Sequence, residues 1–493
     1  MSKIQIGGSK REIGETKQKH LATYLQDVIA LLLLGGLLFY GSFWEMFDTV
    51  RADPALYQCY AVAFWQGWSG LQELPSQVGS PTVRCTLITH PDRHLTGISQ
   101  DELVHTMQRW RLPSSLVQFV AAQSPDQPYH SLPREYPASA LLVFSLGLIA
   151  PAHWYGVAYA IWMILLIGCV YLVLLRWRSR QAALAYSLYL VAGGSATAAS
   201  RLDMLPAALT LFALICTVQK HWNWAFALLA LATLTKFYPV ILLVPFFLAL
   251  QRGVQGEWYG WRRWQPVVLF VGICVLGFSV SLLLSVVGTL APLRYFANRP
   301  VLVETLPASV LWILSLLGKT SLTYVGSFGT SNVLSSLSSN VMFLMTVLLV
   351  IGLISTWYLQ WRRRMDLAMA CLVTLLIMIV TGKVFSPQYL IWVIPLAAYA
   401  GQSNPWWLLS WTLIGLLTTW IYPSIYRMSW AYQVGVTDTP LFYPVSVGRS
   451  FLFLGFIAFV LIFRSRLDHP ASHDKEQVEQ NPTNWWKESG RIG

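Results

Sequence analysis

Residues 205–250 read LPAALTLFALICTVQKHWNWAFALLALATLTKFYPVILLVPFFLAL. Three apolar runs, at 205–218, 222–235 and 237–250, follow one another with only a few polar residues between them. The runs are apolar almost throughout, although a helix of about 14 residues covers only roughly 21 Å of a hydrocarbon core about 30 Å thick. The stretch therefore predicts helices packed inside a membrane rather than a soluble domain.

The composition of the whole chain predicts the same fold class. Of its 493 residues, 55% are hydrophobic and only 11% are charged. Apolar runs recur along the chain with no soluble domain of ordinary size between them. We therefore expect an all-α polytopic membrane protein with about twelve transmembrane helices, at 28–44, 154–175, 182–199, 205–218, 222–235, 237–250, 267–290, 341–358, 367–381, 384–400, 406–421 and 447–463.

These helices are expected to form one integral membrane domain, residues 27–466. The N-terminal segment, 1–26, and the C-terminal tail, 467–493, are placed in the cytoplasm, and the polar composition of the tail predicts disorder. Residues 47–134 then form a large first external loop with interfacial helices. The run 138–150 is too short to cross a bilayer comfortably, and we interpret it as an interfacial or re-entrant helix.

The net charge of +12 is concentrated in short clusters beside the apolar runs. With 138–150 left out of the spans, every such cluster falls on the cytoplasmic side, which is the distribution expected of a multi-pass plasma-membrane protein. The clusters need no nucleic-acid partner to explain them. They lie at the N-terminus and at 176–180, 262–263, 362–364 and 464–466.

Two of the six cysteines, Cys59 and Cys85, share the first external loop. They are candidates for a disulfide in an oxidising compartment, and two separate free thiols are the alternative.

Five short polar motifs lie at ends of apolar runs, and the topology places all of them on the external face. Basic side chains there depart from the positive-inside trend, so insertion bias does not explain them. Charges gathered at one end of a membrane bundle mark a candidate site, and outward cations suit an anionic ligand with a lipid tail. The motifs are Asp53 with Tyr57, Glu135-Tyr136-Pro137, Arg201-Leu202-Asp203, Lys236-Phe237-Tyr238-Pro239 and the KVFSPQY string at 383–389.

Together with the segment from Arg299-Pro300 to Glu304, these motifs in this order resemble the polyprenol-phosphate-mannose-dependent mannosyltransferases of bacteria (glycosyltransferase family 87). The resemblance runs from about Asp48 to Ala400. It implies a GT-C glycosyltransferase bundle that moves a hexose, with mannose expected, from a polyprenyl-phosphate carrier to a lipid or glycan acceptor with inversion. The lipid-linked donor and the glycolipid or glycan acceptor are then the partners of this protein.

An acceptor hydroxyl is a poor nucleophile, so this reaction needs a carboxylate within hydrogen-bond reach to take its proton. The resemblance places that base at Asp53, with Asp48 as the fallback. The alternative for Asp53 is that it only caps the helix that begins with Pro54.

Departure of the lipid phosphate requires fixed positive charge, for which Lys236, Lys383 and Arg201 are the candidates. Snorkelling is the alternative for the two lysines, and an ion pair with Asp203 or with a loop carboxylate is the alternative for Arg201. Residues expected to contact sugar or acceptor are Glu135, Tyr136, Asp203, Tyr238, Arg299, Glu304, Gln388 and Tyr389.

We expect no metal and no further cofactor. His90, Asp92 and His94 loosely suggest metal ligands, but a solvated loop explains them better, and no other pattern has metal-ligand spacing.

Two other classes of function remain open. A transporter or a lipid or glycan flippase requires polar groups near the bilayer midplane and on both sides, and the inner halves of these spans have almost none. A non-enzymatic assembly subunit fits the long loop 72–134 but leaves Lys236 and Lys383 unexplained. The sequence does not identify the acceptor, the sugar, the length of the carrier or the oligomeric state.

Overall fold

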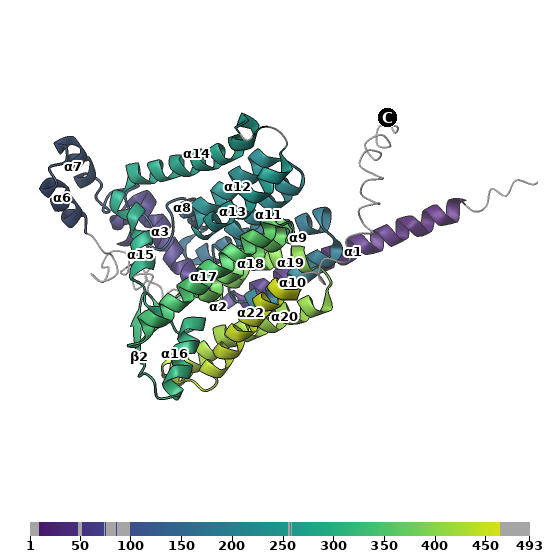
Figure 1. The fold of residues 1–493 in the computed structure, drawn as a ribbon. Helices are drawn as coiled ribbons and strands as arrows, with labels where there is room; N and C mark the ends of the chain where they lie inside the picture. The colour runs from purple at the N-terminus through teal and green to yellow at the C-terminus, as the bar shows by residue number, and fades with distance from the viewer. Residues whose placement is uncertain are drawn as a thin grey trace, which may run out of the picture.

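The computed structural model describes residues 9–47, 52–72, 74, 85, 99–254, 257 and 259–463, and most of these residues are helical. Figure 1 shows long helices running side by side in one bundle, with α1 (Ser9–Gly41) extending beyond it. The helix α1 therefore begins well before the predicted boundary at residue 27. The fallback base Asp48, the residues His90, Asp92 and His94, and the tail 467–493 lie outside the described residues.

Among the described residues, six helical segments are long and apolar enough to cross a membrane, which is consistent with a helical membrane protein. Each of them overlaps one of the predicted spans, and the predicted span 267–290 runs past the end of its helix at Leu284. The helices that contain them are α1, α9 (Tyr155–Trp177), α14 (Trp261–Leu284), α17 (Ser338–Trp361), α20 (Pro405–Thr419) with α21 (Tyr426–Tyr432), and α22 (Phe442–Phe463).

The other six predicted spans fall on helices of 11 to 15 residues. Because these helices are short, the count of twelve spans stays a prediction. Most of them lie in the centre of the bundle, where apolar residues on every face are buried by other helices. They are α10 (Arg180–Gly194), α11 (Met204–Val218), α12 (Trp222–Thr235), α13 (Leu243–Gly253) with the 3-10 turn η4 (Tyr238–Leu242), α18 (Leu367–Thr381) and α19 (Tyr389–Gly401).

The remaining short elements follow α1 or connect the long helices. Residues 140–149 form only α8 (Ala140–Phe144) and the 3-10 turn η2 (Ser145–Ile149), which are too short to span a bilayer, as expected. The others are α2 (Phe43–Phe47), α3 (Asp53–Gln66), η1 (Trp68–Gln72), α6 (Gln100–Arg109), α7 (Ser114–Ala121), η3 (Ala152–Trp154), α15 (Val286–Asn298), α16 (Leu306–Leu316), the π-helical turn η5 (Trp420–Ile425) and η6 (Val436–Asp438).

A small sheet breaks the all-α expectation. Its strands β1 (Val301–Leu302), β2 (Thr323–Ser327) and β3 (Thr330–Leu334) pair antiparallel in the order β1-β3-β2. A two-residue turn, Phe328 and Gly329, joins β2 to β3, and both residues have positive φ, as a tight hairpin turn requires. In Figure 1, β2, α6 and α7 lie at the end of the bundle opposite the one from which α1 extends.

Cys59 and Cys85 form a disulfide, which decides between the two alternatives that the sequence left open. The bond ties α3 to residue 85, in the otherwise undescribed stretch of the first loop.

Candidate functional site

The position of α2 and α3 depends on two close backbone contacts. A Cβ added at Gly41 would lie 2.4 Å from the carbonyl oxygen of Ser195, and one added at Gly156 would lie 2.2 Å from that of Met46. Glycine at these positions lets α1 and α9 approach their neighbours more closely than any other residue would allow. The contacts bring Glu45, on α2, and Asp53, at the start of α3, to the chain segment after α10.

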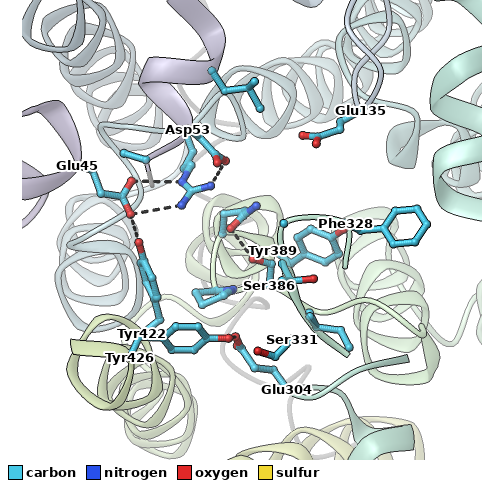
Figure 2. A pocket seen from close by; sticks show the side chains of 18 of the residues that line it. Glu45, Asp53, Glu135, Glu304, Phe328, Ser331, Ser386, Tyr389, Tyr422 and Tyr426 are labelled. Atoms are coloured by element: carbon cyan, nitrogen blue, oxygen red, sulfur yellow. Dashed lines mark hydrogen bonds and ion pairs between the residues drawn. The ribbon is translucent and has the colours of Figure 1, made fainter. Parts of the chain in front are cut away.

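A cavity of about 710 Å³ lies beside this segment and contains most of the predicted site residues. Figure 2 shows carboxylates on opposite sides of it, with Asp53 and Glu135 across from Glu304. Residues from chain segments far apart in sequence therefore meet at one cavity. The predicted residues that line it are Asp53, Glu135, Tyr136, Arg201, Lys236, Arg299, Glu304, Gln388 and Tyr389.

Arg201 is the centre of the charge network on one wall. Its Nη1 forms an ion pair with Asp53, while its Nε and Nη2 each lie 3.3 Å from Glu45. Burial alone would lower the pKa of Arg201, but Glu45 raises it above the ordinary value. The predicted pairing with a loop carboxylate is thus present, with Asp53 and Glu45 rather than Asp203 as the partners.

Asp53 itself is not a helix cap. The N-cap of α3 is Ala52, and Asp53 occupies the first turn with its carboxylate directed to Arg201. The alternative that Asp53 only caps this helix is therefore wrong.

Lys236 forms a second ion pair beneath the cavity. Its Nζ donates to Asp203 Oδ1 at 2.6 Å, and the same oxygen accepts from Trp392 Nε1. Asp203 is completely buried and does not line the cavity, so its carboxylate reaches the cavity only through Lys236. The ammonium also lies over the rings of Tyr136, Tyr389 and Trp392, at 5.4, 5.7 and 5.1 Å from their centroids.

Tyr238 likewise lies behind the cavity. Its ring stacks on Trp392 with the centroids 4.0 Å apart, which supports the indole that binds Asp203. Among the predicted substrate contacts, Tyr238 and Asp203 therefore have supporting positions.

Arg299 is a buried cation with unused hydrogen-bonding capacity. It is 9% exposed, its Nη2 donates to Thr330 Oγ1 at 2.9 Å, and its Nε has no hydrogen-bond partner. Within the described part of the chain, no carboxylate lies within ion-pair distance of Arg299. Thr330, at the start of β3, thus holds a guanidinium that lines the cavity and has no carboxylate partner among the described residues.

Lys383 is near Arg299 but does not line the cavity. Its Nζ donates to the carbonyl oxygen of Ala297 at 2.9 Å. Burial lowers the pKa of Lys383, and the positive charge of Arg299 lowers it further. Its predicted contact with a phosphate therefore requires a movement that Lys236, which lines the cavity, does not need.

Glu304 is held on the opposite wall. Its Oε1 accepts from Tyr426 at 2.6 Å, and its Oε2 lies 3.8 Å from the fully buried Arg449, which also donates to the Glu304 carbonyl. Burial raises the pKa of Glu304, and Arg449 offsets this effect only in part.

Glu135 lines the cavity with a carboxylate, and Tyr136, Gln388 and Tyr389 line it with neutral groups. The Tyr136 hydroxyl lies 3.1 Å from that of Tyr57, and Gln388 Oε1 accepts from Ser386 at 2.6 Å. Tyr389 stacks on Trp392 with centroids 3.8 Å apart, so its ring is fixed within the bundle and is not a membrane-interface residue.

Several residues at this cavity were not predicted from the sequence. Glu45 falls at the end of an apolar run, and Tyr422 and Tyr426 resemble interface aromatics. Arg449 does not line the cavity but contacts Glu304, which does, and it lies inside a predicted span. An arginine inside an apolar run is itself a signal for a site, and it is the one signal here that could have been used. No three His, Cys, Asp or Glu side chains cluster as metal ligands within the described residues.

Comparison of this chain with protein-family models, with curated proteins and with solved structures finds no match.

Proposed function

We propose that this protein is an integral membrane glycosyltransferase. It transfers a hexose, with mannose the first to test, from a polyprenyl-phosphate carrier to a hydroxyl group of a lipid or glycan acceptor, with inversion at the anomeric carbon. The resemblance of the motifs suggests this reaction, and the geometry of the cavity supports it independently.

One observation carries the proposal. Asp53, a carboxylate, shares a cavity with Lys236 and with Arg299, whose guanidinium has no carboxylate partner among the described residues. A base together with cations is what transfer from a phosphate leaving group requires. A site that only binds a neutral ligand has no need for either.

In the proposed step, the acceptor oxygen attacks the anomeric carbon while Asp53 takes the hydroxyl proton. The bond from that carbon to the phosphate oxygen breaks, and its electron pair leaves with the polyprenyl phosphate. Lys236 and Arg299 stabilise the charge that develops on the phosphate. Arg201 holds Asp53 instead of the phosphate, because its three nitrogens are already directed to carboxylates.

The proposed orientation has twelve spans, both termini in the cytoplasm and the cavity facing outward. The basic clusters beside the apolar runs support it. A cavity at the outer end of the bundle also suits a donor whose sugar phosphate lies at the membrane surface and whose tail lies in lipid.

The direct test uses purified protein in vesicles with a radiolabelled polyprenyl-phosphate mannose and a glycolipid extract. Asp53→Asn keeps the size of the side chain and removes the base, so transfer is expected to fall at least about 100-fold, the contribution typical of a general base. The matched control is Asp101→Asn, which changes an exposed carboxylate on α6 and should leave transfer within twofold.

Full activity of Asp53→Asn would remove Asp53 as the base. A wild-type protein that moves the lipid across sealed vesicles without forming a labelled product would instead favour the flippase alternative.

A further inference from the structure

Two clusters of the same composition lie on opposite walls of the cavity. On one wall Glu45 binds Arg201 and accepts a hydrogen bond from Tyr422. On the other, Glu304 binds Arg449 and accepts a hydrogen bond from Tyr426. The two tyrosines are four residues apart, and their rings are 5.4 Å apart, centroid to centroid. Figure 2 shows each hydroxyl directed to its own carboxylate.

Only the first cluster reaches Asp53. The guanidinium of Arg201 lies between two carboxylates, Glu45 on α2 and Asp53 on α3, and it binds both. The side chains of all three are largely buried, with 11%, 10% and 19% exposed for Arg201, Glu45 and Asp53. An ion pair in such surroundings fixes geometry well, because water competes with it poorly.

Glu45 is in turn held by two hydroxyl groups from different parts of the chain. Ser200, adjacent to Arg201, donates to Glu45 Oε2, and Tyr422 donates to Oε1. With two hydroxyl donors and the guanidinium, both carboxylate oxygens have partners. The direction of Arg201, and with it the direction of Asp53, thus depends on α2, on the segment after α10 and on η5.

We propose that Glu45 and Tyr422 are positioning residues that act through Arg201 on Asp53. The inference rests on the proposed function, because it assigns Asp53 the role of base. A base is effective only when it lies within hydrogen-bond reach of the acceptor hydroxyl, and errors of about 1 Å in such geometry cost about 100-fold in rate. Glu45 and Tyr422 then affect the rate without contributing to the affinity for the donor.

The test compares Tyr422→Phe and Glu45→Gln with Tyr171→Phe. Tyr171 is a matched control, because it too is a buried tyrosine that donates to a carboxylate paired with an arginine, at 3.3 Å to Asp27, which binds Arg180 at 2.9 Å. It does not line the cavity. For each variant, kcat, the donor KM and the acceptor KM are measured, and kcat is divided by the fraction of protein molecules that bind the donor. The midpoint of thermal unfolding is measured as well.

Both test variants are expected to lower kcat about 10- to 100-fold with both KM values within twofold, whereas Tyr171→Phe keeps kcat within twofold. Loss of kcat with unchanged KM is the signature of a group that acts only in the transition state, and a merely structural role would lower stability or the competent fraction instead. Unchanged kcat in both variants, or a rise in KM alone, would overturn the inference. A wild-type protein that transfers no sugar would overturn the proposed function, and the inference with it.

Discussion

Replacement of Arg299 by alanine is expected to weaken donor binding about 10- to 150-fold. Arg299 is 9% exposed and lines the cavity, and its guanidinium donates to Thr330 through Nη2 while Nε has no hydrogen-bond partner. A hydrogen bond to a charged group contributes about 1.5–3 kcal/mol, and each 1.4 kcal/mol changes an equilibrium constant about tenfold. One such bond to the donor phosphate gives the expected loss of affinity.

The assay measures the donor KM and, separately, inhibition by the polyprenyl phosphate product, which reports on phosphate binding without the sugar. Arg299→Lys keeps a positive charge but loses the planar fork, so its effect should fall between wild type and alanine. The matched control is Arg294→Ala, which removes an arginine that lies on α15, five residues before Arg299, and does not line the cavity. A change below twofold in both constants for Arg299→Ala would refute the assignment of the phosphate to this residue.

The other predictions concern stability and placement. Asp203→Asn leaves the buried ammonium of Lys236 without its anion and is expected to lower the unfolding free energy by about 3–5 kcal/mol, measured by chemical denaturation; an unchanged stability would contradict the buried ion pair. Gly156→Ala places a Cβ 2.2 Å from the Met46 carbonyl oxygen, so it should lower the unfolding free energy by about 1–3 kcal/mol. It should also displace Glu45 and thereby lower the rate of transfer. Gly168→Ala, on the same helix and with its nearest contact at 3.8 Å, should change neither quantity. Cys59 and Cys85 are 26 positions apart, and reduction of their disulfide should lower the unfolding free energy by about 3–4 kcal/mol. Thermal scans with and without dithiothreitol measure this effect, which a Cys59→Ser variant should no longer show.

The sequence predicted which residues share the site because it predicted where the helices end. Asp53, Glu135, Arg201, Lys236 and Gln388 are far apart in the chain, but each lies beside the end of an apolar run. The charge distribution placed these ends of the apolar runs on one membrane face, and the residues at them line one cavity. Hydrophobic length and the distribution of basic residues thus brought most of these residues together, whereas Asp203, Tyr238 and Lys383 do not line the cavity.

The sequence could not predict which charges pair with each other. Arg201 has Asp203 two positions away, yet it pairs with Glu45 and Asp53, and Asp203 pairs with Lys236 instead. Pairing depends on distances across the bundle, which close contacts such as that of Gly156 with Met46 determine. Periodicity and motif spacing carry no information on those contacts.

The β2–β3 hairpin was missed for a different reason. Its strands have only five residues each, and they lie between apolar helices that dominate any reading of hydrophobic pattern. The hairpin is nevertheless what holds Arg299, through Thr330. The signal for it was the Phe328-Gly329 pair between two β-prone runs, which is typical of a tight turn.

In the proposed reaction, the distribution of charge around the cavity favours departure of the phosphate. Asp53, Glu45, Asp203 and Glu304 are all engaged by arginine or lysine, so these carboxylates present little uncompensated negative charge. Arg299 is not compensated in this way among the described residues, and its buried charge is therefore available to the ligand. The donor phosphate carries a single negative charge while the sugar is attached, and it gains up to one more when the bond to the anomeric carbon breaks. A fixed cation therefore interacts more strongly with the departing phosphate than with the bound donor. That difference, rather than tight binding of the donor, is what lowers the barrier.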